Sequence, residues 1–164
     1  LLQMFPKARF IYIYRNPVDV YLSTYKFITS MIPSLQLEDA PAELISNNIF
    51  LVYNQLIRKY LNTRNLIPPG QFAEVRFEDF EQNPTAEMHR IYHQLNLPNF
   101  DQAAPAFEKY ATSQKTYKKN QFFMAQKLLD RLLAECCFAM QHWKYGVPPH
   151  IEVKKDELVS QMFT

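Results

Sequence analysis

The stretch ARFIYIYRNPVDVYLS, residues 8–23, decides the fold expected for this chain. It contains a continuous apolar run, Phe10–Tyr14, which is typical of a strand buried on both faces of a parallel sheet. Asn16 then predicts a helix N-cap, and Pro17 the first helical residue. The stretch therefore predicts a strand that ends on Arg15, a tight turn and a helix.

The rest of the chain continues this alternation of helix and strand. The sequence predicts helices over residues 17–31, 43–65, 84–96 and 121–143, a second strand over residues 72–77, an acidic loop over residues 78–83 and a further loop over residues 98–105. Strands separated by helices predict an α/β fold, here helix-rich, with a parallel sheet flanked by helices. Residues 1–150 are expected to form part of a single domain, and residues 151–164 a solvated tail.

The composition is that of a folded domain with a substantial core. Of the 164 residues, 48% are hydrophobic and 15% aromatic, which argues against a disordered chain. The charges nearly cancel, 18 basic against 16 acidic, so no nucleic-acid partner is expected. Because Gly70 and Gly146 are the only glycines, neither the G-x-x-x-x-G-K loop nor the G-x-G-x-x-G loop can occur here.

Two further features bear on the compartment. Cys136 and Cys137 are adjacent within an expected helix, where neighbouring side chains point about 100° apart. This favours reduced thiols and a cytoplasmic location over a disulfide.

No apolar run approaches the roughly 18 residues that would span a bilayer, so no membrane segment is expected within the chain. Since the chain starts at Leu1, it is interpreted as the carboxyl-terminal piece of a longer protein, for which an amino-terminal anchor or signal stays open.

The residues that follow the first strand suggest a device for holding a phosphate. Ligands of open α/β sheets bind outside the carboxyl ends of strands, where Arg15 stands, and a guanidinium can bind two phosphate oxygens at once. At 100° per residue, positions 16 and 23 lie about 20° apart around a helix, so Ser23 shares the face from which the chain enters. Its hydroxyl can donate one hydrogen bond. The alternative is that Arg15 simply pairs with a carboxylate, Asp19 or Glu78, and that Ser23 has no role.

The segment RNPVDVYLS, residues 15–23, placed after an apolar strand, resembles the 3′-phosphate-binding motif of sulfotransferases that use 3′-phosphoadenosine 5′-phosphosulfate (PAPS). The arginine and the serine stand eight residues apart, as they do in that family. EVRFEDFEQNP, residues 74–84, and IYHQLNLP, residues 91–98, resemble the following strand, acidic pair and helix of the same fold, in the same order. The resemblance covers roughly residues 5–146, is closest to bacterial-type members, and implies a partial P-loop-like parallel sheet.

The resemblance implies roles for five residues. Arg15 and Ser23 would bind the 3′-phosphate of the nucleotide. Phe77 stands where many members carry a tyrosine near the adenine, so it would pack against the base without a polar contact; the alternative is a core phenylalanine at the end of a strand. Lys118 and Lys119 fall where the family brings a late basic segment over the nucleotide, although the arginine-lysine-glycine signature is missing; the alternative is an ordinary solvated pair.

The implied activity is transfer of a sulfuryl group from PAPS, as co-substrate, to the hydroxyl or amine of an unknown acceptor, without a metal. In the family, the phosphosulfate-binding loop and the general base lie nearer the amino terminus, and neither pattern occurs in this segment. No catalytic residue is therefore assigned here, and the segment alone is expected to be inactive. Two alternatives stay open: a non-catalytic helical interaction or scaffold domain derived from the same fold, and a relative of the P-loop kinases.

Two histidines on one predicted helix have the spacing of zinc ligands. His89 and His93 stand four residues apart, a spacing at which both imidazoles can bind one zinc ion. The sequence offers no third ligand and no glutamate beside the first histidine, so an exposed histidine pair is the favoured interpretation.

Overall fold

The computed structural model describes residues 2–35, 37–114 and 122–154. The chain divides into two compact units, and each is described by itself. The first unit comprises Leu1–Arg15 and Asn62–Lys119, and the second comprises Asn16–Leu61 and Asn120–Thr164. None of the helices within the described residues combines the length and the apolarity needed to cross a membrane.

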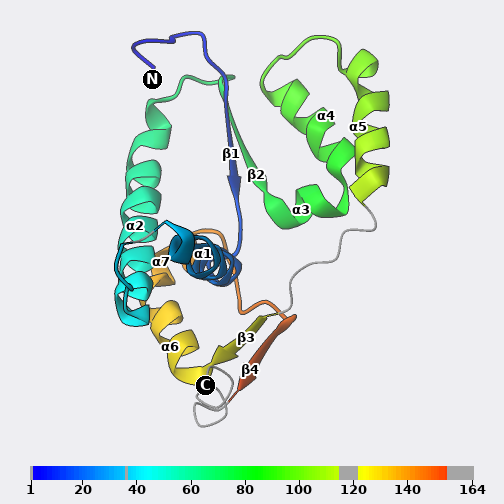
Figure 1. The fold of residues 1–164 in the computed structure, drawn as a ribbon. Helices are drawn as coiled ribbons and strands as arrows, with labels where there is room; N and C mark the ends of the chain where they lie inside the picture. The colour runs from blue at the N-terminus through cyan, green and yellow to red at the C-terminus, as the bar shows by residue number, and fades with distance from the viewer. Residues whose placement is uncertain (1, 36, 115–121, 155–164) are drawn as a thin grey trace. The chain divides into compact units, whose positions relative to one another are not determined.

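The first unit is built on two parallel strands. β1 (Phe10–Tyr14) and β2 (Phe72–Arg76) pair in parallel, with Phe10 opposite Phe72 and Tyr14 opposite Arg76 (Figure 1). The bounds of β1 match the prediction, and β2 ends one residue earlier than predicted. The parallel pairing confirms the α/β fold class expected from the order of strands and helices.

Helix α4 (Pro84–Gln94) covers one face of this sheet. Ala73 and Val75 of β2 are completely buried, and they form a core with Ile91 and Leu95 from α4 and the residue that follows it. The contact follows from the two periodicities, because residues 73 and 75 share one face of a strand while residues 91 and 95 share one face of a helix.

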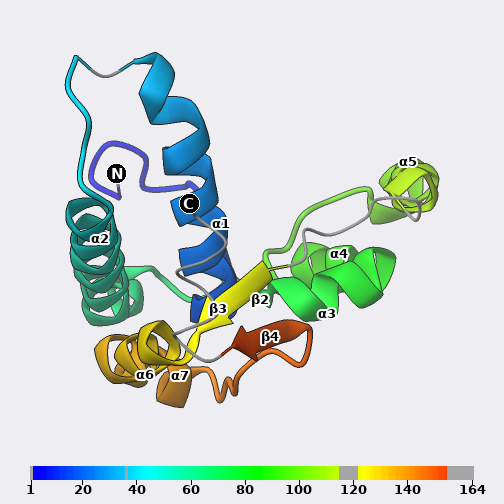
Figure 2. The same cartoon turned by 60° about the horizontal axis from the view of Figure 1, so that its bottom comes forward.

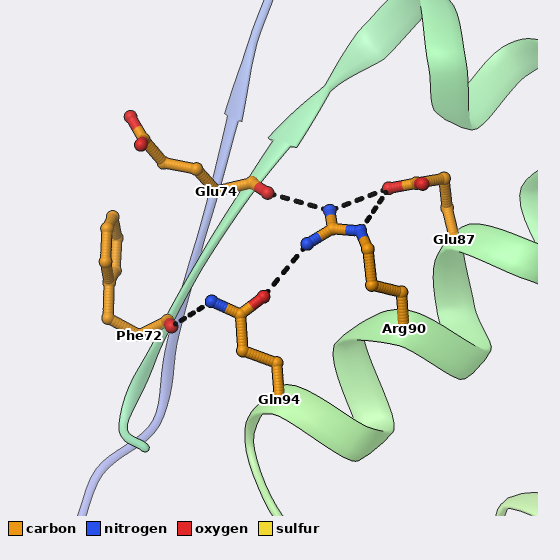
Figure 3. A network of polar contacts seen from close by, with 5 residues as sticks. All are labelled: Phe72, Glu74, Glu87, Arg90 and Gln94. Carbon is orange, nitrogen blue, oxygen red and sulfur yellow. Dashed lines mark hydrogen bonds and ion pairs between the residues drawn. The ribbon is translucent and has the colours of Figure 1, made fainter. Parts of the chain in front are cut away.

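The same helix also binds the outer edge of β2 (Figure 3). Arg90 donates to the carbonyl oxygen of Glu74 at 2.8 Å, and Gln94 donates to that of Phe72 at 3.0 Å. Glu87 holds the Arg90 guanidinium at 2.7 Å. Successive carbonyls of a strand point to opposite edges, and that of Gln71 accepts from Phe10 on the β1 side. The α4 side chains therefore satisfy the edge of β2 that faces away from β1, and within the described part of the chain no further strand pairs with the other edge of β1.

Two predicted loops of the first unit are helices. The acidic loop predicted over residues 78–83 is wrong, because α3 (Phe77–Gln82) forms there, with Glu78 and Asp79 in its first turn, where carboxylates stabilise a helix. The loop predicted over residues 98–105 is also wrong, because α5 (Phe100–Gln114) forms there despite an internal proline, Pro105. Its aromatic rings explain this: Phe100 and Phe107 pack edge-on against Tyr92 of α4 at centroid distances of 5.3 and 5.9 Å.

The second unit is held together by helices. α1 (Pro17–Met31), which matches its predicted bounds, packs on α2 (Ala42–Thr63), whose last residues belong to the first unit. The buried Tyr21 of α1 shares a 2.8 Å hydrogen bond with Ser46 and stacks on Phe50, with ring centroids 4.8 Å apart. The guanidinium carbon of Arg131 lies over the Phe50 ring, 4.6 Å from the ring centroid. The short 3₁₀ turns η1 (Ile32–Ser34) and η2 (Arg64–Leu66) follow these two helices.

The long helix predicted over residues 121–143 is wrong. The segment forms strand β3 (Phe122–Ala125), helix α6 (Gln126–Glu135) and helix α7 (Cys137–His142) (Figure 2). β3 pairs in parallel with β4 (Ile151–Lys154). These four residues therefore form a strand, whereas the sequence predicts a solvated tail over residues 151–164. The reason is long-range, since a strand of four residues forms only where a distant segment completes its hydrogen bonds.

Candidate functional site

The first feature of the site is the contact between Arg15 and Phe77. Arg15 directly follows β1 and Phe77 directly follows β2, so the register that sets Tyr14 opposite Arg76 brings the next two residues side by side. The guanidinium carbon of Arg15 lies 4.5 Å from the centroid of the Phe77 ring. This is a cation–π contact at the carboxyl ends of two parallel strands, the edge at which open α/β sheets bind ligands. Both residues are half-buried.

Several other charged groups line these two strands. Arg76 ends β2, and its Nε lies 3.4 Å from Oε2 of Glu78. Glu74 lies two residues earlier on β2, and Nη1 of Arg64 is 3.1 Å from both of its oxygens. Arg76 is a second cation at the strand ends that the sequence argument missed. Its only signal in the sequence is its place near the end of the second predicted strand.

The tyrosines of β1 are held in their neutral form. Burial raises the pKa of Tyr12, and the negative charge of Glu74 raises it further. Burial also raises the pKa of Tyr14, again with a smaller contribution from Glu74. A phenol with a raised pKa keeps its proton at neutral pH, so both side chains stay uncharged, Tyr12 in the middle of β1 and Tyr14 at its carboxyl end.

In the second unit, the start of α1 is anchored by two buried polar residues. The side-chain oxygen of Asn16 accepts from the backbone N–H of Val18 at 3.0 Å, which confirms the predicted N-cap. Its amide nitrogen donates to the carbonyl of Gly146 at 2.8 Å. Asp19, with 4% of its surface exposed, places Oδ1 2.9 Å from Nε2 of His150. The partners at positions 146 and 150 are about 130 residues away, so no local signal in the sequence could reveal them.

Ser23 lies on the exposed face of α1, one position after the buried pair Tyr21 and Leu22. Tyr21 faces α2, whereas Ser23 is exposed, so the serine hydroxyl is accessible to a ligand. Ser23 belongs to the second unit, whereas Arg15 and Phe77 belong to the first.

Two further predictions concern a pair of lysines, as phosphate contacts, and a pair of histidines, as zinc ligands. Lys118 and Lys119 lie outside the residues that the structure describes. His89 packs its ring edge-on against Phe100 at a centroid distance of 4.8 Å. Across residues 2–35, 37–114 and 122–154, no group of three or more His, Cys, Asp or Glu side chains is arranged to hold a metal ion.

Comparison with known proteins gives a consistent result. A family model described as the sulfotransferase family matches residues 1–102, which is more than half of the chain. The chain is 28% identical over 155 residues to the omega-hydroxy-beta-dihydromenaquinone-9 sulfotransferase Stf3 of Mycobacterium bovis, and equally to the protein of that name from Mycobacterium tuberculosis. The match covers 92% of this chain and 38% of each relative, so the chain spans well under half the length of these relatives. No solved structure matches the chain significantly.

Proposed function

Because the chain belongs to the sulfotransferase family, we propose that it forms the part of a PAPS-dependent sulfotransferase that holds the 3′-phosphate of the nucleotide. Arg15 and Ser23 are the proposed phosphate contacts, and Lys118 and Lys119 the proposed additional ones. Phe77 lies beside the same site. The observation that carries the proposal is the Arg15 guanidinium held over an aromatic ring at the carboxyl ends of two parallel strands.

The residues present suit a phosphate. A guanidinium presents a rigid fork of N–H donors that matches two phosphate oxygens, and it stays charged at every physiological pH. The exposed hydroxyl of Ser23, eight residues along the chain, adds one donor at the spacing that the family uses. These groups bind and orient a nucleotide, and none of them is placed to take a proton from an acceptor. The proposed role of this segment is therefore anchoring.

In the proposed reaction, an acceptor oxygen attacks the sulfur of PAPS in line with the bond to the departing phosphate. The S–O bond to the acceptor forms as the S–O bond to the nucleotide breaks, 3′,5′-adenosine bisphosphate leaves, and the hydroxyl proton passes to the general base, which the family carries nearer the amino terminus. Such a transfer demands accurate positioning, which an anchored 3′-phosphate supplies. The names of the two mycobacterial relatives specify a hydroxylated substrate, so we propose a hydroxyl rather than an amine as the acceptor group.

The test is a titration of the full-length natural protein with 3′,5′-adenosine bisphosphate by calorimetry. Removing one charge-assisted contact costs about 1.5–3 kcal/mol, so Arg15→Ala should weaken binding by roughly 10- to 150-fold. Ser23→Ala should weaken it by about 3- to 30-fold, because the hydroxyl makes a single charge-assisted hydrogen bond to the phosphate from an exposed position, worth about 0.7–2 kcal/mol.

Arg9→Gln is the matched control. Arg9 stands at the opposite end of the same strand and donates to the carbonyl of Asn96 at 3.3 Å. Its replacement should leave the affinity unchanged. Binding that survives Arg15→Ala intact would exclude Arg15 from the phosphate site, and a protein that binds no nucleotide at all would support the scaffold alternative.

A further inference from the structure

We propose that Phe77 is a positioning residue, whose ring orients the Arg15 guanidinium toward the 3′-phosphate, and that the face of the ring under Arg15 is not the surface on which the adenine stacks. This inference rests on the function proposed above, since it concerns how that phosphate site is assembled. Its evidence is the 4.5 Å separation of the Arg15 guanidinium carbon and the centroid of the Phe77 ring.

An aromatic ring suits this task better than a carboxylate. A carboxylate beside Arg15 would neutralise its charge and occupy its N–H donors, and both are needed for a phosphate. The face of a phenylalanine ring attracts the cation electrostatically but accepts no strong hydrogen bond, so the contact with the ring does not itself neutralise the charge or use the N–H donors. A long, flexible side chain is thereby restrained without losing its binding capacity, which lowers the entropy cost of binding.

The ring itself is held in place by the fold. Phe77 is the first residue of α3 and directly follows β2, whose Val75 is completely buried two residues earlier. One turn further along α3, Phe80 packs against the core formed by β2 and α4. The backbone on both sides of Phe77 is thus fixed by packing, so its ring gives Arg15 a rigid support.

The contact also argues against stacking of the adenine on the same face of the ring. A cation that lies 4.5 Å from the centroid covers that face, and a base cannot occupy the same space. The two roles differ in what they recognise. A residue that positions Arg15 affects only ligands with a 3′-phosphate, whereas a residue that stacks on adenine affects every adenine nucleotide.

The experiment compares two nucleotides on the same full-length protein: 3′,5′-adenosine bisphosphate, and adenosine 5′-monophosphate, which lacks the 3′-phosphate. Phe77→Leu keeps an apolar side chain but removes the ring. It should weaken binding of the bisphosphate by about 3- to 30-fold and change binding of the monophosphate by less than about 2-fold. Phe77→Tyr keeps the ring and should retain the affinity of the natural protein for both.

A double-mutant cycle completes the test. In the Arg15→Ala background, Phe77→Leu should cause no further loss of bisphosphate affinity, because the group that the ring positions is already gone. Each variant is measured with both nucleotides. A general loss of folded protein would lower the measured number of binding sites equally for the two, so it cannot imitate the expected result.

The outcomes separate the two proposals. If Phe77→Leu weakens both nucleotides equally, or if its effect adds fully to that of Arg15→Ala, the positioning role is wrong. If the natural protein binds the two nucleotides with equal affinity, no 3′-phosphate site exists, and the proposed function itself fails, together with the inference built on it.

Discussion

At the scale of the residue, the chemistry of Arg15 depends on shape as well as charge. Its guanidinium is planar, stacks on the Phe77 ring and offers several donors in a fixed geometry. A lysine at the same position would carry the same charge as a compact ammonium group. This difference allows the contribution of geometry to be measured separately from that of charge.

Arg15→Lys should therefore bind 3′,5′-adenosine bisphosphate with an affinity between those of the natural protein and Arg15→Ala. The charge is kept but the two-point contact is lost, which we expect to cost about 1 kcal/mol. The measurement is calorimetry at two salt concentrations. An affinity equal to that of the natural protein would show that charge alone holds the phosphate.

The two adjacent cysteines should react very differently. Cys136 is buried, and burial raises its pKa to about 12, with smaller contributions from Glu135 and Cys137. Cys137 is exposed. Only a thiolate is a strong nucleophile, so iodoacetamide at pH 8 should label Cys137 and spare Cys136 until the protein unfolds. Mass spectrometry of the labelled peptides measures the extent of labelling of each thiol. Equal labelling of both thiols in the folded protein would contradict the buried position of Cys136.

The same shift predicts how stability responds to alkaline pH. The pKa of Cys136 in the folded protein lies above the ordinary thiol value of 9.0, so the unfolded chain loses this proton first. The contribution of Cys136 to stability is therefore fully present below pH 9 and is lost as the pH rises from 9 to about 12. The mid-point of urea unfolding of a Cys136→Ala variant should fall less over that range than that of the natural protein.

At the scale of the element, two helices begin with the same dipeptide in different surroundings. Asn16-Pro17 starts α1 and Asn83-Pro84 starts α4, and in both cases the asparagine oxygen accepts a backbone N–H. Asn16 is buried and also donates to the carbonyl of Gly146, whereas Asn83 is exposed. The same local motif therefore acts as a cap and a long-range tether in α1, and as a cap in α4.

Asn16→Ala should destabilise the protein by about 1–3 kcal/mol, because it removes the cap and leaves the Gly146 carbonyl without its donor. Asn83→Ala, the matched control, should cost about 0.5–1 kcal/mol as the loss of an exposed cap. Urea unfolding of both variants measures the difference. Equal losses would show that the bond to Gly146 contributes nothing to stability.

At the scale of the whole molecule, the sheet of the first unit is covered unevenly. Ile11 and Ile13 of β1 lie opposite Ala73 and Val75 of β2, so all four side chains point to the same face. The two β2 residues are completely buried under α4, yet Ile11 and Ile13 are 48% and 54% exposed. The packing of α4 thus protects one strand of the pair and not the other.

This asymmetry predicts that the same kind of substitution lowers the free energy of unfolding by different amounts in the two strands. Val75→Ser should destabilise the protein by about 3 kcal/mol or more, since it removes buried apolar surface and buries a hydroxyl. Ile13→Ser should cost less than about 1 kcal/mol, in keeping with a half-exposed position. Chemical unfolding provides the comparison. A large loss for Ile13→Ser in the full-length protein would show that another part of the polypeptide covers β1.

The elements that the sequence predicted correctly carry strong local signals. β1 and α1 match because an apolar run, an Asn-Pro cap and a helical period coincide within one short stretch. The failures have a common physical cause. Residues 122–125 read as helix but form β3, because β4, which begins at residue 151, completes its hydrogen bonds. The acidic residues 78–83 read as a loop, but the packing of Phe80 against the core helps to hold α3 in place.

The sequence by itself determined the family, the parallel α/β design and the identity of Arg15 and Ser23 as phosphate contacts to be tested, because these depend on residue types at fixed short spacings. Only the tertiary structure decided what surrounds them: Phe77 under the guanidinium, the carbonyl of Gly146 beside the cap, and His150 on Asp19. Those partners lie 62 to 131 positions away along the chain. Contacts of that range arise from packing and sheet register, which no local pattern encodes.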